Sequence, residues 1–201
     1  RMTEPAAIVG ALFGAHQGPL AGLSAVITAG PTYEDIDPVR FIGNRSSGRM
    51  GFAVAAAAAE AGARVQLVAG PVRLDTPPGV ERVDVRSAAE MRDAVMARIA
   101  GADLFIGVAA VADYAPAERA GQKIKKSAER RSLDLAQTPD ILAEVAALEN
   151  RPFTVGFAAE TENVRAHALE KLSRKRLDMI AANCVGSESS GFESEFNEIL
   201  L

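Results

Sequence analysis

The chain has 201 residues, of which 48% are hydrophobic and 24% are charged, a composition that suits a globular protein with one sizeable core. Its formal net charge of −4 argues against a broad surface for nucleic acid, and leaves open a local basic pocket for a phosphorylated small molecule. The single cysteine, Cys184, excludes a disulfide within the chain and fits a reducing compartment. We therefore expect one cytoplasmic domain that binds no nucleic acid.

No segment of the sequence predicts a membrane partner. The alanine-rich segment 52–63 is shorter than the roughly 20 residues that a spanning helix needs, and it contains Glu60. The N-terminal residues lack the basic region, the sustained apolar run and the cleavage site of a secretory signal peptide. Residues 1–22 predict instead a helix and a linker that lead into the domain.

Apolar runs rich in β-branched residues alternate with helical patterns along the chain, as they do in repeated βα units on a parallel sheet. The expected strands are 24–29, 65–69, 80–85, 103–109, 153–158 and 179–183. The expected helices are 49–62, 87–100, 139–148 and 162–175. This order predicts an α/β fold with a Rossmann-like, doubly wound and mostly parallel sheet.

Two of the expected helices begin with capping signals. Ser87 and Glu90 have the spacing of a capping box. Thr138 followed by Pro139 predicts an N-cap with proline in the first helical position.

A long polar loop separates the first expected strand from the helix that begins at Arg49. Structureless loops longer than roughly 12–15 residues are uncommon unless they are functional or disordered. In an open α/β sheet, the N–H groups at such a helix start favour phosphate or carboxylate oxygens. Gly48 and Gly51 are spaced like the last two glycines of a dinucleotide fingerprint, but about eighteen residues separate Gly30 from Gly48. We therefore expect a ligand at this loop, in a site other than the ordinary fingerprint. The polar side chains that the loop offers are Arg40, Asn44, Ser46 and Ser47.

Residues 112–131 interrupt the βα pattern, because they have no clear periodicity and are rich in Lys, Arg, Ala and Gly. This composition predicts a mobile flap. The chain also holds two basic patches, which suit a ligand with several phosphates; they are Lys123, Lys125 and Lys126 on the flap, and Lys171, Arg174, Lys175 and Arg176 at the end of a later helix. A solvated charged loop and charges that complement a helix dipole are the alternative interpretations.

Six ordered motifs identify a family. They are ITAGPT, DPVRFIGNRSSGRMG, AAVADYAP, KIKK, TPDIL and VGFAAET. Together they resemble the phosphopantothenoylcysteine synthetase domain of bacterial coenzyme A biosynthesis, over residues 24–196. The resemblance implies an enzyme, a phosphopantothenate–cysteine ligase. Such a ligase activates 4′-phosphopantothenate with CTP and Mg²⁺ to an acyl-cytidylate, releases pyrophosphate, and then couples the acyl group to L-cysteine with loss of CMP.

The resemblance also implies a domain organisation. Bacterial members of this family are usually homodimers, fused behind a decarboxylase domain that uses FMN. Residues 1–22 would then be the lead-in from that domain, and residues 23–201 would be the synthetase domain with an incomplete C-terminus. Cofactors expected for this chain are CTP as the substrate nucleotide and Mg²⁺, whereas FMN belongs to the decarboxylase domain alone.

Carried over residue by residue, the resemblance implies three catalytic side chains. Asn44 matches an asparagine at the activated acyl group, Lys123 matches a flap lysine that neutralises charge as pyrophosphate leaves, and Arg40 matches an arginine linked to the second half-reaction. The residues that match the nucleotide site are Gly107, Val108, Ala109, Asp113, Lys123, Pro139, Asp140, Ile141, Leu142, Phe157, Lys171 and Lys175. No residue is expected to bind metal directly, because the triphosphate carries most of the Mg²⁺ ligands.

Other interpretations stay open at this point. Asn44 can satisfy the loop backbone, Asp113 can cap the turn after its strand, and Phe157 can belong to the core. The same sheet can also serve a nicotinamide oxidoreductase, although the acidic residue that would bind ribose is missing after segment 65–69. A third possibility is a dimerisation module without catalytic activity.

Overall fold

A computed structural model describes residues 18–126, 131–160, 162–184 and 199–201, and of the side chains in these ranges those of residues 159, 160 and 184 are not described. The helix expected before residue 18 and the side chain of Cys184 therefore lie outside the described part. Residues 18–22 form a turn in which Leu20 N–H donates to the carbonyl of Ala61 over 2.9 Å. Among the described helices, none combines the length and the apolar composition that a membrane span requires.

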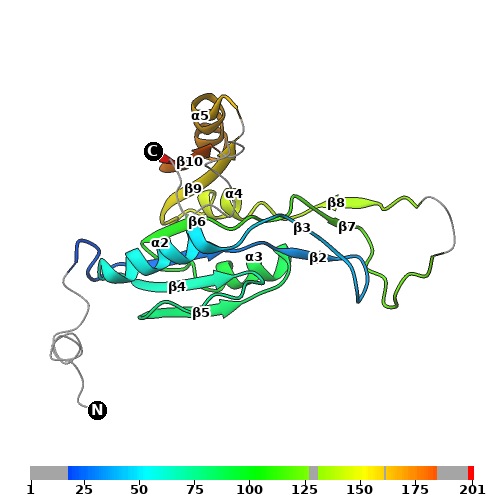
Figure 1. Ribbon diagram of the computed structural model, residues 1–201. Helices are drawn as coiled ribbons and strands as arrows, with labels where there is room; N and C mark the ends of the chain where they lie inside the picture. The colour runs from blue at the N-terminus through cyan, green and yellow to red at the C-terminus, as the bar shows by residue number, and fades with distance from the viewer. Residues whose placement is uncertain (1–17, 127–130, 161, 185–198) are drawn as a thin grey trace, which may run out of the picture.

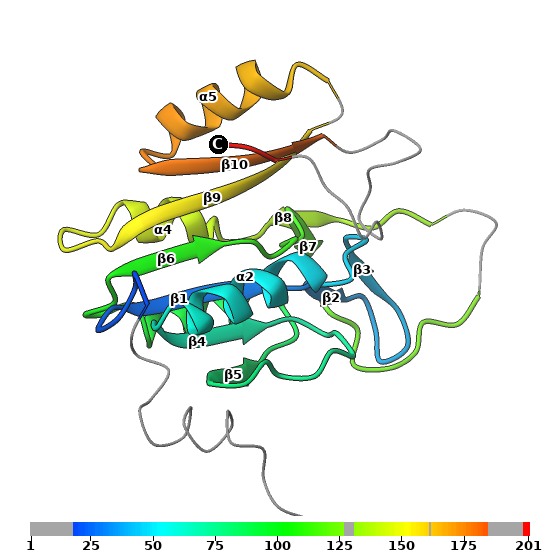
Figure 2. The same cartoon turned by 60° about the vertical axis from the view of Figure 1, so that its left-hand side comes forward.

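A seven-stranded sheet forms the centre of the molecule, in the order β11-β10-β9-β6-β1-β4-β5 (Figures 1 and 2). Only the edge strand β11 pairs antiparallel to its neighbour, so the expected mostly parallel α/β sheet is confirmed. The strands are β1 (Ser24–Ala29), β4 (Arg64–Ala69), β5 (Val80–Asp84), β6 (Leu104–Gly107), β9 (Phe153–Glu160), β10 (Met179–Cys184) and β11 (Ile199–Leu200).

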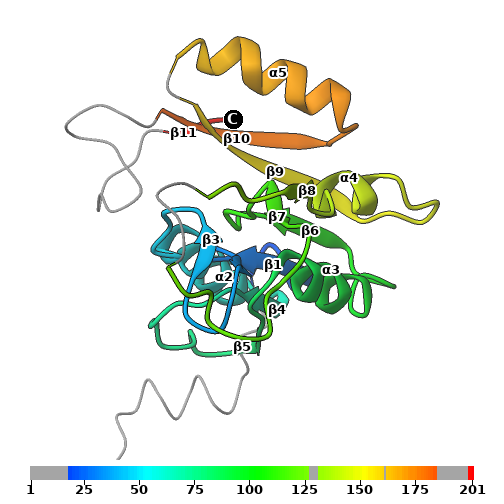
Figure 3. The ribbon, with the colours of Figure 1, turned by 90° about the vertical axis from the view of Figure 1, so that its right-hand side faces the viewer.

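Alternating apolar residues on the central strands bury both faces of the sheet. On β1, Ala25 and Ile27 pack in the core cluster that contains Phe52 of α2 (Arg49–Glu60), whereas Val26 packs in the cluster of α3 (Ala88–Met96). Helix α4 (Ile141–Ala146) contributes to the α3 cluster, and α5 (Val164–Arg174) packs on β9 and β10 (Figure 3). Because buried parallel strands leave only their ends open, a ligand site is expected at one end of this sheet.

The two predicted helix caps have different outcomes. The Ser87 hydroxyl accepts the N–H of Glu90 over 3.2 Å, so that cap is confirmed, while the Glu90 carboxylate accepts the N–H of Arg86. The Thr138 cap is wrong. Helix α4 begins at Ile141 behind an Asp140 cap, and the Thr138 hydroxyl instead donates to the carbonyl of Ala112 over 2.6 Å.

Two short antiparallel ribbons project from the carboxyl end of the sheet (Figure 1). One pairs β2 (Tyr33–Asp35) with β3 (Phe41–Gly43), and the other pairs β7 (Tyr114–Pro116) with β8 (Leu135–Gln137). With their connections they form what we call the arm, residues 32–43, 113–126 and 131–137. The sequence predicted only a loop and a flap here, because strands of three residues show no periodicity of their own.

An acidic and aromatic cluster fastens the β2–β3 ribbon to the start of α3. The rings of Tyr33 and Phe41 stack with centroids 3.9 Å apart, and the Arg86 guanidinium lies over both rings. Arg86 Nη2 also pairs with Asp35 over 2.7 Å. Buried Glu34 accepts the N–H of Ala88, in the first turn of α3, over 2.8 Å.

Candidate functional site

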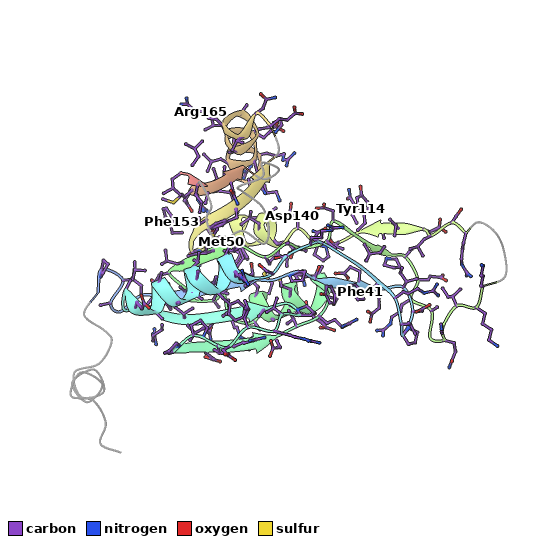
Figure 4. The ribbon with its side chains drawn as sticks, in the orientation of Figure 1. Phe41, Met50, Tyr114, Asp140, Phe153 and Arg165 are labelled. Atoms are coloured by element: carbon purple, nitrogen blue, oxygen red, sulfur yellow. The ribbon has the colours of Figure 1, made fainter. Side chains whose placement is uncertain are left out.

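A cleft of about 1080 Å³ opens at the carboxyl ends of β1, β6, β9 and β10. Backbone of Gly107 and Ala109 forms its floor. The Ala109 N–H donates to the Thr28 hydroxyl over 3.2 Å. The labelled Met50 and Asp140 belong to opposite walls, on α2 and at the start of α4 (Figure 4). This is the edge at which open α/β sheets bind their ligands.

The first wall is the loop 44–48 and the start of α2. Gly48, the residue that caps this helix, has φ 77, and a Cβ there would lie 2.9 Å from Val72 Cγ1. A Cβ on Gly51 would lie 2.5 Å from the Cβ of Ala29, so this glycine lets α2 pack closely against β1. The helix start therefore sits close to the end of β1, with its N–H groups beside the cleft.

Asn44 lines the cleft and is tied to the segment between β6 and β7. Its amide Nδ2 donates to the carbonyl of Val111 over 2.9 Å and, at 3.4 Å, approaches that of Ala110. The side chain therefore holds loop backbone, which was the alternative interpretation, and the same bonds keep its amide at the cleft. Its contact with an acyl group remains a prediction.

The second wall joins α4 to the end of α5. Asp140 Oδ1 caps α4 by accepting the N–H of Ala143 over 3.1 Å, and Lys175 Nζ lies 2.8 Å from Asp140 Oδ2. Burial alone would raise the pKa of Asp140, but the ion pair with Lys175 and the Ala143 N–H outweigh it, so its pKa is below the ordinary value. Asp140 is therefore ionised at neutral pH, and it holds the Lys175 ammonium at the cleft.

Lys171 follows the same helix face one turn earlier. Its Nζ donates to the carbonyl of Phe157 over 2.8 Å, and the residue lines the cleft with Phe157 itself. Arg45 and Arg49 add two further cations from the first wall. An acidic chain thus concentrates positive charge in one cleft, as a ligand with several phosphates requires.

The structure brings most of the predicted site residues together in this cleft. The predicted site residues that line the cleft are Asn44, Gly107, Val108, Ala109, Asp113, Pro139, Asp140, Ile141, Leu142, Phe157, Lys171 and Lys175. Arg40 and Lys123 do not line it. Both lie on the arm, where Arg40 pairs with Asp37 and donates to the carbonyl of Ile124 over 3.0 Å. Their distance from the cleft follows from the projection of the arm, which the sequence did not predict.

Sequence reasoning missed several lining residues, among them Arg45, Arg49, Met50, Tyr114, Gln137 and Asn183. Asn183 stands near the carboxyl end of β10, so the rule that ligands bind at strand ends could have found it. Gln137 ends β8, a strand of three residues that the sequence does not predict. Tyr114 begins β7, and no local signal points to it.

Among the described residues, no group of three His, Cys, Asp or Glu side chains is arranged to hold a metal ion. The donors that line the cleft are amides, hydroxyls, lysines and arginines, with Asp113 and the paired Asp140 as its carboxylates. These groups fit a metal that arrives on a polyphosphate better than a resident ion.

Comparisons with known proteins agree with the motifs. A family model described as the DNA/pantothenate metabolism flavoprotein C-terminal domain matches residues 20–201. Coenzyme A biosynthesis bifunctional protein CoaBC of Vibrio parahaemolyticus serotype O3:K6 (strain RIMD 2210633) is 56% identical over 185 residues, which are 90% of this chain and 46% of that protein. The chain thus spans about half the length of the curated relatives it matches.

Solved structures have the same fold. A crystal structure of the C-terminal domain of CoaBC aligns with a TM-score of 0.71 and 43% identity, covering 81% of this chain and 77% of that one. A Cab2 mutant in complex with phosphopantothenate-cysteine aligns with a TM-score of 0.68 over 96% of this chain and 82% of that one, and its 16% identity shows the fold alone. The resemblance inferred from the motifs is therefore confirmed. The chain belongs to the family of the DNA/pantothenate metabolism flavoprotein C-terminal domain, the domain that CoaBC proteins carry.

Proposed function

We propose that this chain is a phosphopantothenate–cysteine ligase that activates 4′-phosphopantothenate with CTP. The observation that carries the proposal is the cleft, which joins a backbone floor to Asn44 on one wall and to Lys171 and Lys175 on the other. A nucleotide on this floor would direct its phosphates between the lysines and the start of α2. The bound Mg²⁺ would neutralise part of the triphosphate charge.

The names of related proteins support the substrate class. CoaBC relatives are called coenzyme A biosynthesis proteins, and the Cab2 complex contains phosphopantothenate-cysteine. A fused decarboxylase domain with FMN, a homodimer and the substrates 4′-phosphopantothenate and L-cysteine belong to the same proposal. Residues 23–201 would form the synthetase domain, and residues 1–22 its lead-in.

The reaction needs two displacements and no nucleophile from the protein. A carboxylate oxygen of 4′-phosphopantothenate attacks the α-phosphorus of CTP, and the bond to pyrophosphate breaks. The amine of L-cysteine then attacks the acyl carbon, the bond to CMP breaks, and the amine loses a proton. The protein contributes orientation and charge stabilisation in both steps. We assign Asn44 as the donor to the acyl oxygen, and Lys171 and Lys175 to the phosphates.

Release of pyrophosphate tests this proposal directly. The chain is incubated with Mg²⁺, CTP and 4′-phosphopantothenate, with and without L-cysteine, and ATP replaces CTP in a parallel series. We expect release that requires 4′-phosphopantothenate and prefers CTP, and we expect Asn44→Ala to lower its rate by about 10²–10³. Asn150→Ala is the matched control, because Asn150 is exposed and lies outside the cleft. Release that does not depend on 4′-phosphopantothenate, or binding of NADPH instead of CTP, would contradict the proposal.

A further inference from the structure

A buried carboxylate on the arm, outside the cleft, makes more hydrogen bonds than its turn requires. The Asp37 side chain is 0% exposed. Its Oδ1 accepts the N–H groups of Val39 over 2.8 Å and of Arg40 over 2.9 Å. These two bonds close the turn between β2 and β3, as an aspartate commonly does.

The other oxygen reaches a segment that is distant in sequence. Asp37 Oδ2 accepts the N–H of Ile124 over 3.1 Å and also pairs with the Arg40 guanidinium. Arg40 Nη2 in turn donates to the carbonyl of Ile124 over 3.0 Å. One ion pair therefore satisfies both backbone groups of Ile124, as a neighbouring strand would do.

Ile124 lies between two of the flap lysines, Lys123 and Lys125, which are exposed. Among the described contacts, the segment 121–126 is attached to the rest of the molecule through Ile124. The nearest further attachment is the N–H of Ala120, which donates to the carbonyl of Ile36 on the same ribbon over 2.9 Å. Any approach of Lys123 to a nucleotide therefore involves the β2–β3 ribbon, because the two segments are bonded together.

We propose that Asp37 and Arg40 are positioning residues that fix the lysine segment 121–126 to the β2–β3 ribbon, so that Arg40 serves the reaction through Lys123. The bonds that Arg40 makes to Asp37 and to the Ile124 carbonyl carry this assignment. The pairing also explains why an arginine stands there, since a lysine cannot bond Asp37 and the Ile124 carbonyl with one planar group. The part of the assignment that concerns Lys123 rests on the proposed function.

Amide hydrogen exchange tests the attachment without any substrate. Asp37→Asn removes the ion pair with Arg40 and replaces one of the two acceptor oxygens by an NH2 group, so we expect the Ile124 amide to exchange about tenfold faster or more, while the amides of β1 and β4 keep their protection. Asp84→Asn, which changes a 70% exposed carboxylate on β5, is the control and should leave Ile124 unchanged. Unchanged exchange at Ile124 in Asp37→Asn would overturn the proposal. If that variant loses its fold, Arg40→Lys at the 50% exposed partner provides the same measurement.

Pyrophosphate release tests the functional half through a double-mutant cycle. We expect Arg40→Lys and Lys123→Ala each to lower kcat by about tenfold or more with the KM for CTP nearly unchanged, and the double variant to equal Lys123→Ala within about twofold. Fold losses that multiply in the double variant would show that Arg40 acts independently of Lys123, and would overturn the positioning role. If the wild-type chain releases no pyrophosphate, the proposed function fails and the role toward Lys123 falls with it, while the exchange experiment still decides the attachment.

Discussion

Asp140 and Lys175 join two helices across the wall of the cleft, because Lys175 Nζ lies 2.8 Å from a carboxylate that also caps α4. The ammonium is therefore held where a phosphate would approach. Replacing Lys175 by Met should weaken binding of Mg²⁺–CTP by about tenfold or more, the loss of one charge-assisted contact. Titration calorimetry measures this affinity. Arg174→Met is the matched control, since Arg174 is 65% exposed, pairs with Glu170 and lies outside the cleft. Equal losses in both variants would mean a general effect of charge.

Close packing of α2 on β1 depends on the missing side chain of Gly51. A methyl group there would lie 2.5 Å from the Cβ of Ala29, so Gly51→Ala should lower the free energy of unfolding by about 1–3 kcal/mol through overpacking. Urea denaturation measures the change. Gly121→Ala is the control, because a Cβ at Gly121 would meet no heavy atom within 4 Å, and it should change stability by less than about 0.5 kcal/mol. A neutral Gly51→Ala would show that the helix can shift away from the strand.

The central sheet could be predicted because its signals are local. The bounds of β1 agree with the expected 24–29, and β4 and β10 each gain one residue at an end. The hydroxyl cap at Ser87 was found because its partner Glu90 lies in the same turn. Helix α3 ends at Met96, earlier than expected, and the 97–102 region continues as turns.

The arm and its contacts could not be predicted, because they depend on residues far apart in sequence. Strands β2 and β7 each have three residues, and nothing within them indicates which ribbon they join. The bond from Ile124 to Asp37 spans 87 residues. The same dependence on distant residues explains which parts of the site could not be predicted. The resemblance placed Gly107 and Phe157 at the cleft, and Gly107 ends β6 there, whereas the position of Arg40 and Lys123 depends on where the arm points.

The Arg151–Asp178 ion pair predicts how stability depends on pH. Arg151 Nη2 lies 2.8 Å from Asp178 Oδ1 and, with the Thr154 N–H, lowers the pKa of Asp178 below its ordinary 3.8 although burial opposes the shift. The unfolded chain therefore binds the proton more tightly than the native protein. This contribution is fully present above the unfolded pKa and is lost as pH falls through the native one. Urea midpoints between about pH 7 and pH 3 should fall less steeply in Asp178→Asn than in the wild type. If the urea midpoints of the two proteins fell equally with pH, the Asp178 carboxylate would not be the source of this pH dependence.

Glu34 ties the arm to the start of α3, because its buried carboxylate accepts the N–H of Ala88 over 2.8 Å. Glu34→Ala removes the acceptor and leaves a buried donor without its partner, so we expect a loss of about 1–3 kcal/mol in the free energy of unfolding. Glu34→Gln keeps an amide oxygen of the same reach and should lose about 1 kcal/mol or less. Denaturation of the two variants beside Glu81→Ala, a change of an exposed carboxylate on β5, separates the bond from the charge. If Glu34→Gln were as unstable as Glu34→Ala, the negative charge at the helix start, and not the hydrogen bond, would hold the arm in place.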